Sequence, residues 1–108
     1  MLKIWLDDVR PAPLGFRWVR SVNEAKYAIE AAELMNRFSG GKEYYHIECI
    51  SLDHDLGDYA SDGGDGIKLM DWLAERGTLY PLEFHSMNVV GMENMKRMHR
   101  RYWLGERL

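Results

Sequence analysis

Two short apolar runs that stop at acidic residues constrain this chain more than any other feature. The first run, Leu2–Leu6, is followed by Asp7 and Asp8, and the second, Ile47–Leu52, is followed by Asp53. Apolar runs of this length are typical of strands buried inside a parallel sheet. Because the carboxyl ends of parallel strands lie along one edge, we expect these three carboxylates to converge there.

The residues between and after these runs alternate between strand and helix patterns. Residues 16–20 mix apolar side chains with arginines, as an edge strand does. Ser21 begins a Ser-x-x-Glu capping box, and further helices are predicted after Gly66 and Asn88, with a strand at 82–85 between them. The residues expected to face the core are Ala25, Ile29, Ala32 and Met35 in the first helix, Ile67, Met70 and Leu73 in the second, and Met92, Met95, Met98 and Tyr102 in the third.

This order of elements predicts an α/β fold with an open, mostly parallel sheet of about four strands. The 108 residues fit one domain, 1–108. Pro11 and Pro13 make residues 9–15 a loop, where a regular βαβ unit would have a helix. A second loop, at 57–64, is rich in Gly, Asp and Ser, and we expect it to be mobile and functional.

Charge and cysteine content limit the classes of function. The formal net charge of −3 is too small to predict a nucleic-acid or membrane partner by itself. The single cysteine, Cys49, excludes an internal disulfide and a thiolate metal cluster, which favours a reducing compartment. The sequence shows no leader-like start and no window of membrane-spanning length, so we expect a cytoplasmic protein without a membrane partner.

Polar side chains follow three of the predicted strands. Besides the pair Asp7-Asp8, they are Asp53-His54-Asp55 and His85-Ser86-Met87-Asn88. Carboxylates held within a few ångströms repel one another, and a hard cation such as Mg²⁺ relieves the repulsion because it prefers oxygen ligands. A proton retained by one carboxylate would also relieve it. The residue types leave both outcomes open.

These residues resemble those of the cyclic-phosphate processing receiver domains, and the resemblance covers nearly the whole chain. It is carried by Leu6-Asp7-Asp8 with Arg10 and Pro11, by Ser51-Leu52-Asp53-His54-Asp55-Leu56-Gly57, and by His85-Ser86-Met87-Asn88 with Gly91. In ordinary receivers, an acidic pair and the aspartate of the third strand bind Mg²⁺, that aspartate accepts a phosphoryl group, and a Ser or Thr contacts it. The resemblance implies these roles for Asp7, Asp8, Asp53 and Ser86.

The chain also departs from ordinary receivers. Their first helix is replaced by the Pro-rich loop that carries Arg10, and their fifth strand with its phosphate-binding lysine is expected to be absent. His85 adds a second protonatable group beside Ser86. These departures disfavour a standard phosphorelay and favour a site for a phosphate-bearing small molecule.

The function we expect is metal-dependent hydrolysis of a phosphoester. The substrate would be a cyclic phosphate or a related phosphorylated nucleotide or ribose. Mg²⁺ or another divalent cation would polarise a phosphate oxygen and lower the pKa of a bound water. Its ligands would be Asp7, Asp8, Asp53 and Asp55.

The remaining polar residues would bind and transform the substrate. Arg10 would hold the phosphate through its forked donors, and Asn88 would supply a neutral hydrogen bond. In this hypothesis His85 protonates the leaving alkoxide, or His54 positions the attacking water, since imidazole titrates near neutral pH. The residues assigned to catalysis are Asp53, His54, His85 and Ser86.

Other functions fit the same residues. A non-catalytic receiver-like module would sense a phosphorylated ligand or dock a protein partner, and an aspartyl-phosphate acceptor would be labelled on Asp53. The haloacid-dehalogenase phosphatases also begin with an apolar strand and Asp-x-Asp, but their downstream lysine and acidic pair have no clear counterpart here. Structural roles are also open: Asp7 and Asp8 as strand-end caps, Arg10 in a surface ion pair, His85 bonded to the backbone, and Asn88 as a plain helix cap.

The last predicted helix is basic on one side. A solvated face is one interpretation, and weak contact with RNA, with Tyr102 and Trp103 as stacking surfaces, is another. The sheet edge left without a fifth strand is open to pairing with another subunit in a two-fold dimer. The basic residues concerned are Lys96, Arg97, Arg100 and Arg101, with Arg107 beyond them.

Overall fold

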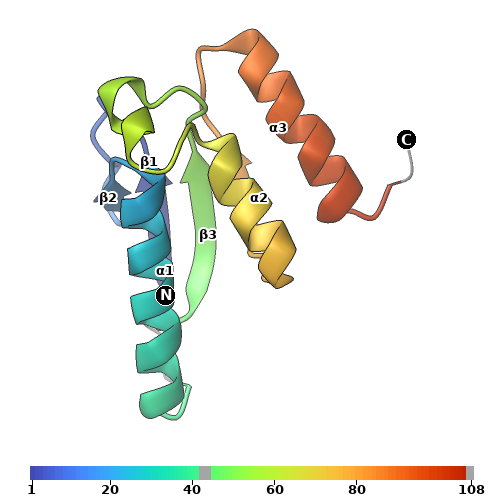
Figure 1. Cartoon of the computed structure of the whole chain (residues 1–108). Coiled ribbons are helices and arrows are strands. Elements are labelled where there is room, and N and C mark those ends of the chain that lie inside the picture. The colour runs from blue at the N-terminus through green and yellow to red at the C-terminus, as the bar shows by residue number, and fades with distance from the viewer. Residues whose placement is uncertain (42–44, 107–108) are drawn as a thin grey trace.

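Four parallel strands form one sheet in the order β2-β1-β3-β4 (Figure 1). The computed structural model describes residues 1–41 and 45–106, so Arg107 of the predicted basic group lies outside the described residues. The predicted α/β fold with a parallel sheet is confirmed. The strands are β1 (Leu2–Leu6), β2 (Arg17–Val19), β3 (Ile47–Leu52) and β4 (Leu82–Phe84), and the helices are α1 (Val22–Phe38), the short 3₁₀ helix η2 (Gly57–Ser61), α2 (Ile67–Arg76) and α3 (Val89–Tyr102).

The strand register brings the last residues of all four strands to one level. Leu6 pairs with Val19 on one side and with Leu52 on the other, and Leu52 pairs with Phe84. The residues that follow β1, β3 and β4 therefore emerge side by side at the carboxyl edge of the sheet. The fourth strand ends at Phe84, one residue earlier than predicted, so His85 already belongs to this edge.

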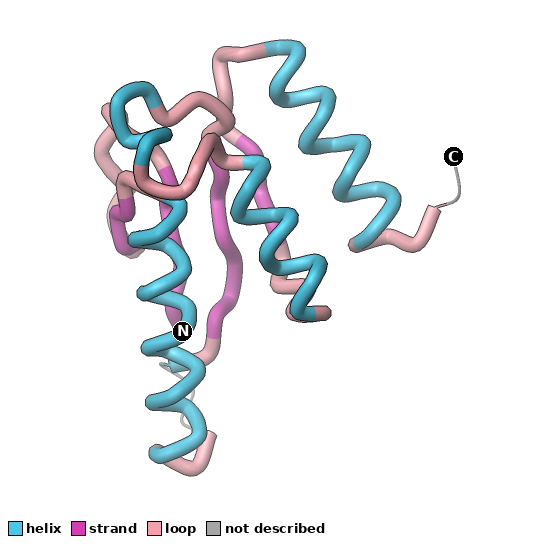
Figure 2. The backbone as a smooth tube through the Cα atoms, in the orientation of Figure 1, coloured by secondary structure: helices cyan, strands magenta, loops and turns pink. Residues whose placement is uncertain are grey.

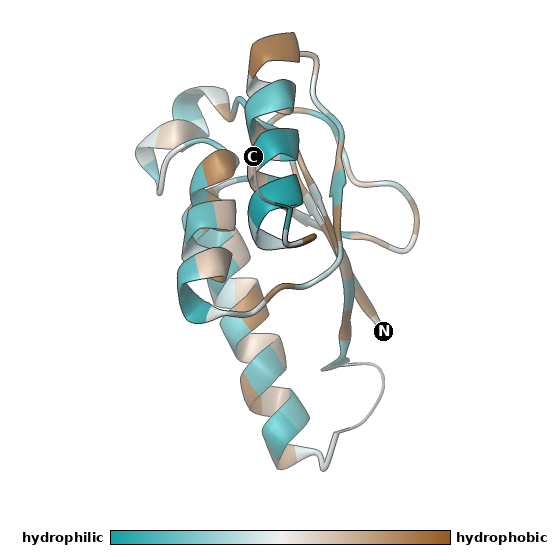
Figure 3. Cartoon of the chain, turned by 90° about the vertical axis from the view of Figure 1, so that its right-hand side faces the viewer, coloured by the Kyte–Doolittle hydropathy of each residue, from teal (hydrophilic) through white to brown (hydrophobic). Residues whose placement is uncertain are grey.

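All three α-helices lie on one side of the sheet (Figures 1 and 3). Because side chains alternate along a strand, the buried Ile4 and Leu6 face the helices, whereas Trp5 faces the opposite side. There, Phe16 of the β1–β2 connection packs edge-on against Trp5. The core between sheet and helices is one cluster that includes Ile4, Leu6, Val19, Ile50 and Leu52 from the strands and Val22, Ala25, Ala28, Ile29, Ala32, Leu69, Met70, Leu73 and Met95 from the helices.

Local signals set the helix ends. The Ser21 hydroxyl accepts a hydrogen bond from the Glu24 amide at 3.0 Å and donates one to the Asp62 carboxylate at 2.6 Å, so it caps α1 and ties it to the end of η2. The Glu24 carboxylate accepts from the Arg20 amide at 3.3 Å, one residue before the position that a reciprocal capping box would use. α2 ends at Gly77, whose φ of 72° lies in the left-handed region that favours glycine.

Two residues predicted to face the core do not. Met35 is 44% exposed and Tyr102 is 48% exposed, because both lie in the last turns of their helices, where no opposing layer covers them. Figure 1 shows α1 continuing past the end of the sheet. Ile67 is only partly buried beside the core. The other residues predicted to face inward are buried or packed against the core: Ala25, Ile29, Ala32, Met70, Leu73, Met92, Met95 and Met98.

The two predicted loops differ in structure. The connection between β1 and β2 contains no helix (Figure 2), as Pro11 and Pro13 predicted. The glycine-rich segment 57–64 is not an open loop, because most of it forms η2. A backbone hydrogen bond of 3.1 Å from the Asn23 amide to the Asp62 carbonyl holds it against the start of α1.

Cys49 is a buried free thiol on β3. Burial raises its pKa, and the neighbouring Glu83 raises it further. A buried thiol of this kind is a packing residue rather than a nucleophile. None of the described helices has the length and apolar character needed to cross a membrane.

Candidate functional site

Three carboxylates meet at the carboxyl edge of the sheet, as predicted. Asp7 and Asp8 follow β1, Asp53 follows β3, and one oxygen of each lies within 4.8 Å of the others. Asp7 is only 3% exposed, so the group is partly removed from water. Like charges at this spacing raise the energy of the ionised state unless a cation or a proton compensates them.

The carboxylates form one wall of a cavity of about 220 Å³. Its walls come from three connections, those following β1, β3 and β4, and the even register of these strands brings them together. Arg10 adds a positive charge to this wall of carboxylates, and two exposed apolar side chains, Val9 and Met87, form part of the rim. The lining residues are Asp7, Asp8, Val9, Arg10, Asp53, Asp55, Ser86, Met87 and Asn88.

Asp7 is held from two directions. Its Oδ1 accepts hydrogen bonds from the backbone amides of Val9 at 2.9 Å and Arg10 at 2.7 Å. This turn of the Pro-rich loop points the carboxylate inward. Its Oδ2 lies 3.2 Å from Nε2 of His85. Every hydrogen bond fixes the orientation of the carboxylate before any ligand arrives.

His85 lies behind Asp7 and does not line the cavity. Its ring stacks on Trp5, with centroids 3.5 Å apart, and its Nδ1 is 2.7 Å from the Ser51 hydroxyl. Burial lowers the pKa of His85, and the positive Arg10 lowers it further, although Asp7 acts in the opposite direction. In the neutral ring, Nε2–H donates to Asp7 and Nδ1 accepts from Ser51, so both nitrogens are engaged.

The surroundings of Asp53 disfavour its negative charge. Burial raises its pKa, and the nearby Asp7 and Asp8 raise it further. A hydrogen bond from the Ser86 hydroxyl and one of 2.9 Å from the His54 amide lower it in part. A cation bound beside this carboxylate would remove the cost of ionising it.

A glycine lets the chain pack closely behind Asp53. At Gly66, which precedes α2, a Cβ atom would lie 1.9 Å from the Asp53 carbonyl oxygen. The Gly66 amide donates to the His54 carbonyl at 2.7 Å. Only glycine allows the start of α2 to approach the end of β3 this closely, so Gly66 is part of what positions the site.

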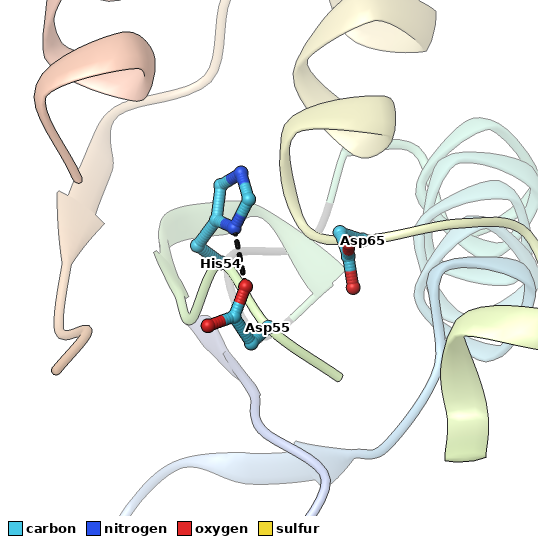
Figure 4. A group of neighbouring side chains, drawn as sticks. All are labelled: His54, Asp55 and Asp65. Atoms are coloured by element: carbon cyan, nitrogen blue, oxygen red, sulfur yellow. Dashed lines mark hydrogen bonds and ion pairs between the residues drawn. The ribbon is translucent and has the colours of Figure 1, made fainter. Parts of the chain in front are cut away.

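Asp55 lines the cavity but belongs to a different group of potential ligands. His54 and Asp55 are bonded to each other, with His54 Nδ1 2.7 Å from Asp55 Oδ1, and Asp65 approaches them from the segment before α2 (Figure 4). Hydrogen bonds from His54 and then from Asn88 lower the pKa of Asp55. One ligand atom of each of the three lies within 4.8 Å of the others. The structure therefore groups Asp55 with His54 and Asp65, and the cluster of Asp7, Asp8 and Asp53 is separate.

Asn88 is a helix cap, one of the two roles considered for it, and it also contacts Asp55. Its side-chain oxygen accepts from the Gly91 amide at 2.9 Å and caps α3, while its Nδ2 donates to both oxygens of Asp55 at 3.1 Å. His54 packs directly against this first turn: a Cβ at Gly91 would lie 2.5 Å from its Cγ. The start of α3 is thus bonded to the end of β3, and His54 does not line the cavity.

Arg20 is a site residue that the sequence analysis missed. Its Nε and Nη2 donate to the Asp8 carbonyl at 2.9 and 2.6 Å, and its guanidinium lies over the rings of Trp18 and Tyr59. These contacts hold the backbone of Asp8 from outside the cavity. The signal was its place directly after an edge strand that also carries Trp18, but a surface arginine in that position predicts no specific partner.

Arg10 has no such engagement. Its side chain lines the cavity and forms no ion pair with any residue in the described ranges 1–41 and 45–106, so the surface ion pair considered for it is not observed. Ser86 accepts from the Asn88 amide at 3.2 Å and also reaches Asp53. The cavity therefore offers a free guanidinium and a hydroxyl beside three converging carboxylates.

A comparison with known protein families matches residues 2–101 to the family described as the cyclic-phosphate processing Receiver domain. No curated protein matches the chain. No solved structure matches it either. The family match runs from β1 nearly to the end of α3, so it includes every residue that lines the cavity.

Proposed function

The chain belongs to the family of cyclic-phosphate processing receiver domains, and we propose that it is a metal-dependent phosphoester hydrolase acting on a small cyclic phosphate. The observation that carries this proposal is the convergence of three carboxylates and one unpaired guanidinium on the same cavity. The carboxylates suit a divalent cation, and the guanidinium suits a phosphate.

The donor set fits a hard cation such as Mg²⁺. Asp7, Asp8 and Asp53 would hold it, because each offers an oxygen within 4.8 Å of the others and hard cations prefer oxygen ligands. When bound, such a cation supplies Lewis acidity and a water of lowered pKa. Asp55 is a weaker candidate than the sequence proposed, since it groups with His54 and Asp65 rather than with these three carboxylates.

The chain's own residues would bind and orient the phosphate. The Arg10 guanidinium would hold two phosphate oxygens through its paired donors. Ser86 would donate to a third oxygen once its contact with Asp53 is exchanged for the ligand. The cavity of about 220 Å³ admits a phosphate and part of a sugar, which favours a small molecule over a folded protein partner.

We assign His54 and His85 to positioning rather than to proton transfer. Both ring nitrogens of His85 are engaged with Asp7 and Ser51, and neither imidazole lines the cavity. His85 would fix the orientation of a metal-binding carboxylate, as partners of metal ligands commonly do. His54 would fix Asp55 against the start of α3.

One observation favours a second candidate, a non-catalytic module that senses a phosphorylated ligand. Among the described residues, those lining the cavity include no histidine, and the acids found there are carboxylates. A module of this kind would bind the metal and the phosphate and leave the phosphoester intact.

The experiment that separates these functions follows phosphorus NMR spectra of cyclic nucleotides and cyclic ribose phosphates incubated with the protein. We expect ring opening in the presence of Mg²⁺ and none in the presence of EDTA. Asp53→Asn should reduce the rate at least about 100-fold, because it removes a metal ligand. The matched control is Asp58→Asn, an exposed carboxylate of η2 outside the cavity, which should retain the wild-type rate.

Three outcomes would redirect the proposal. Full magnesium-dependent cleavage by the Asp53→Asn protein would refute it. Binding of the cyclic phosphates without turnover would support the sensing module. Stable labelling of Asp53 by a small phosphodonor would instead indicate an aspartyl-phosphate acceptor.

The predicted RNA contact and cytoplasmic location stay predictions. On α3, Lys96, Arg97 and Arg101 are exposed, while Arg100 lies near Glu106. The Trp103 indole is not free to stack on a base, because its N–H donates to the Tyr80 carbonyl at 2.8 Å and its ring lies beside His99.

A further inference from the structure

The outer face of α1 carries an apolar stripe that no other element in the described part of the chain covers. Tyr27 is 73% exposed, Leu34 is 45% exposed and Phe38 is 81% exposed, with the small Ala31 between them. At 100° per residue, these four lie opposite the buried face formed by Ala25, Ala28, Ile29 and Ala32. Figure 1 shows the end of this helix extending beyond the sheet. α1 is therefore apolar on two faces and has a partner on one.

The spacing of the stripe is that of a helix–helix seam. Residues 27, 31, 34 and 38 follow one another at intervals of four, three and four, the pattern that places side chains between those of a second helix. A set of scattered surface residues would not repeat in this way. A groove of about 450 Å³ runs along the same face and includes Tyr27, Ala31 and Leu34 in its walls.

We propose that the stripe is a homodimer interface, in which α1 packs antiparallel against α1 of a second copy. In this arrangement Tyr27 lies opposite Phe38 of the other copy, and Ala31 lies opposite Leu34. In the first layer the two aromatic rings stack on each other, and in the second the small Ala31 leaves room for Leu34. A two-fold axis produces every contact twice, as in most small homodimers.

Charge complementarity selects the second copy and this direction. Glu30 and Arg37 flank the stripe on the same side, two turns apart, and both line the groove. In the antiparallel pair, Glu30 lies opposite Arg37 of the second copy, and the symmetric pair repeats the contact. In a parallel pair, this flank would face the opposite flank of the second helix, so Glu30 and Arg37 would not meet.

These two charges are available for such pairing. Neither Glu30 nor Arg37 forms an ion pair with another residue of the described part of the chain. The neighbouring Glu33 differs because its carboxylate accepts hydrogen bonds from Arg76, at 2.5 Å, and from the Tyr80 hydroxyl of the same chain. The groove thus presents one fixed carboxylate and one unpaired charge of each sign.

The proposed interface leaves the cavity open. The cavity lies at the carboxyl edge of the sheet, near the start of α1, whereas the stripe extends to the other end of that helix (Figure 1). The dimer is therefore independent of the proposed hydrolase function. It also differs from a dimer paired through the edge of β4, which the sequence had left open.

Sedimentation equilibrium of the wild-type chain and two single variants tests this arrangement. We expect the wild type to dimerise, and Glu30→Arg and Arg37→Glu each to weaken dimerisation about tenfold or more, because each turns both attractive contacts into repulsive ones. Circular dichroism spectra should match the wild type, since both residues are exposed.

One mixture and one double variant make the test specific for the antiparallel pair. An equimolar mixture of the two single variants should form a heterodimer about as stable as the wild-type dimer, because both cross-pairs are then attractive. The double variant Glu30→Arg/Arg37→Glu should also dimerise. A wild-type chain that stays monomeric at several hundred micromolar would overturn the proposal. So would single variants that dimerise as well as the wild type, since the stripe would then bind another partner or the contact would lie elsewhere.

Discussion

The site contains two histidine–aspartate pairs of the same chemistry in different surroundings. The side chains of His85 and Asp7 are 12% and 5% exposed, and their pair lies between Ser51, Trp5 and the backbone of the Pro-rich loop. His54 and Asp55 are 16% and 60% exposed, and their pair lies at the rim beside the start of α3. The Asp7 carboxylate of the first pair is almost entirely shielded from water, whereas the Asp55 carboxylate of the second pair is exposed to it.

The difference explains which carboxylate is suited to a metal. A carboxylate oriented by several internal hydrogen bonds, as Asp7 is, loses little conformational freedom when a cation binds. Asp55 is also oriented by hydrogen bonds, from His54 and Asn88, but its side chain is 60% exposed and it lies with His54 and Asp65, apart from the other carboxylates. The same residue pair therefore orients a candidate metal ligand in one place and joins two segments of the chain in the other.

The largest difference between the pairs should appear in magnesium binding. Asp7→Asn should weaken Mg²⁺ affinity about 100-fold or more, because it removes a charged ligand, whereas Asp55→Asn should change it less than about threefold. Isothermal titration calorimetry with MgCl₂ or MnCl₂ measures both. Equal losses in the two variants would show that the pairs are equivalent and that Asp55 belongs to the metal site.

Replacing each histidine by alanine should lower the free energy of unfolding by different amounts in the two pairs. His85→Ala should lower the free energy of unfolding by about 3 kcal/mol, because Oδ2 of the buried Asp7 carboxylate and the Ser51 hydroxyl each lose their contact with His85. His54→Ala should lower it by about 1 kcal/mol, since Asp55 remains hydrated. Urea unfolding in EDTA gives both values without a contribution from metal. A greater loss for His54→Ala would reverse the comparison.

A substitution at Gly91 tests the close contact between the first turn of α3 and the His54 ring. Gly91→Ala should cost about 1–3 kcal/mol in the wild type, because the new Cβ would lie 2.5 Å from the His54 ring. In the His54→Ala background the same change should be neutral or stabilise by up to about 1 kcal/mol, because alanine is the better helix former. The double-mutant cycle is measured by urea unfolding. If the substitution costs the same stability in both backgrounds, the His54 ring is not the reason why position 91 requires glycine.

The smallest expected effect concerns Ser51, the hydrogen-bond partner of His85 on the side away from Asp7. Ser51→Ala should lower the free energy of unfolding by about 1 kcal/mol, because Nδ1 of His85 loses its hydrogen bond in a buried position. The matched control is Ser61→Ala, whose hydroxyl donates to the Asp58 carbonyl at an exposed position and should cost less than about 0.5 kcal/mol. Equal losses of stability in the two serine variants would show that the hydrogen bond between Ser51 and His85 is no better protected from water than the exposed one.

Local signals in the sequence predicted the framework of the site. The apolar runs located β1 and β3, and the acidic residues directly after them identified Asp7, Asp8 and Asp53, because strands in one register expose the next residues at one edge. The Ser21 cap was also predicted, since it depends on only a few neighbouring residues.

Residues whose role depends on distant segments were missed or assigned differently. Ser51 reads as one more residue of a buried strand, and only the return of the chain at β4 places it beside His85. Arg20 gains its role from the Asp8 carbonyl and from Tyr59 of η2. Met35 fitted the helical period but lies where no layer covers the helix.

The sequence by itself determined the α/β order of elements, the strand ends and the residue types that meet there, because these follow from periodicity and from turn and cap residues close together in the chain. Only the tertiary structure decided that both histidines turn behind the cavity, that Asp55 pairs with His54 and Asn88, and that α1 has an uncovered second face. The physical reason is that side-chain direction and burial depend on which elements pack together, and a side chain satisfies its hydrogen bonds with whichever groups that packing brings within reach.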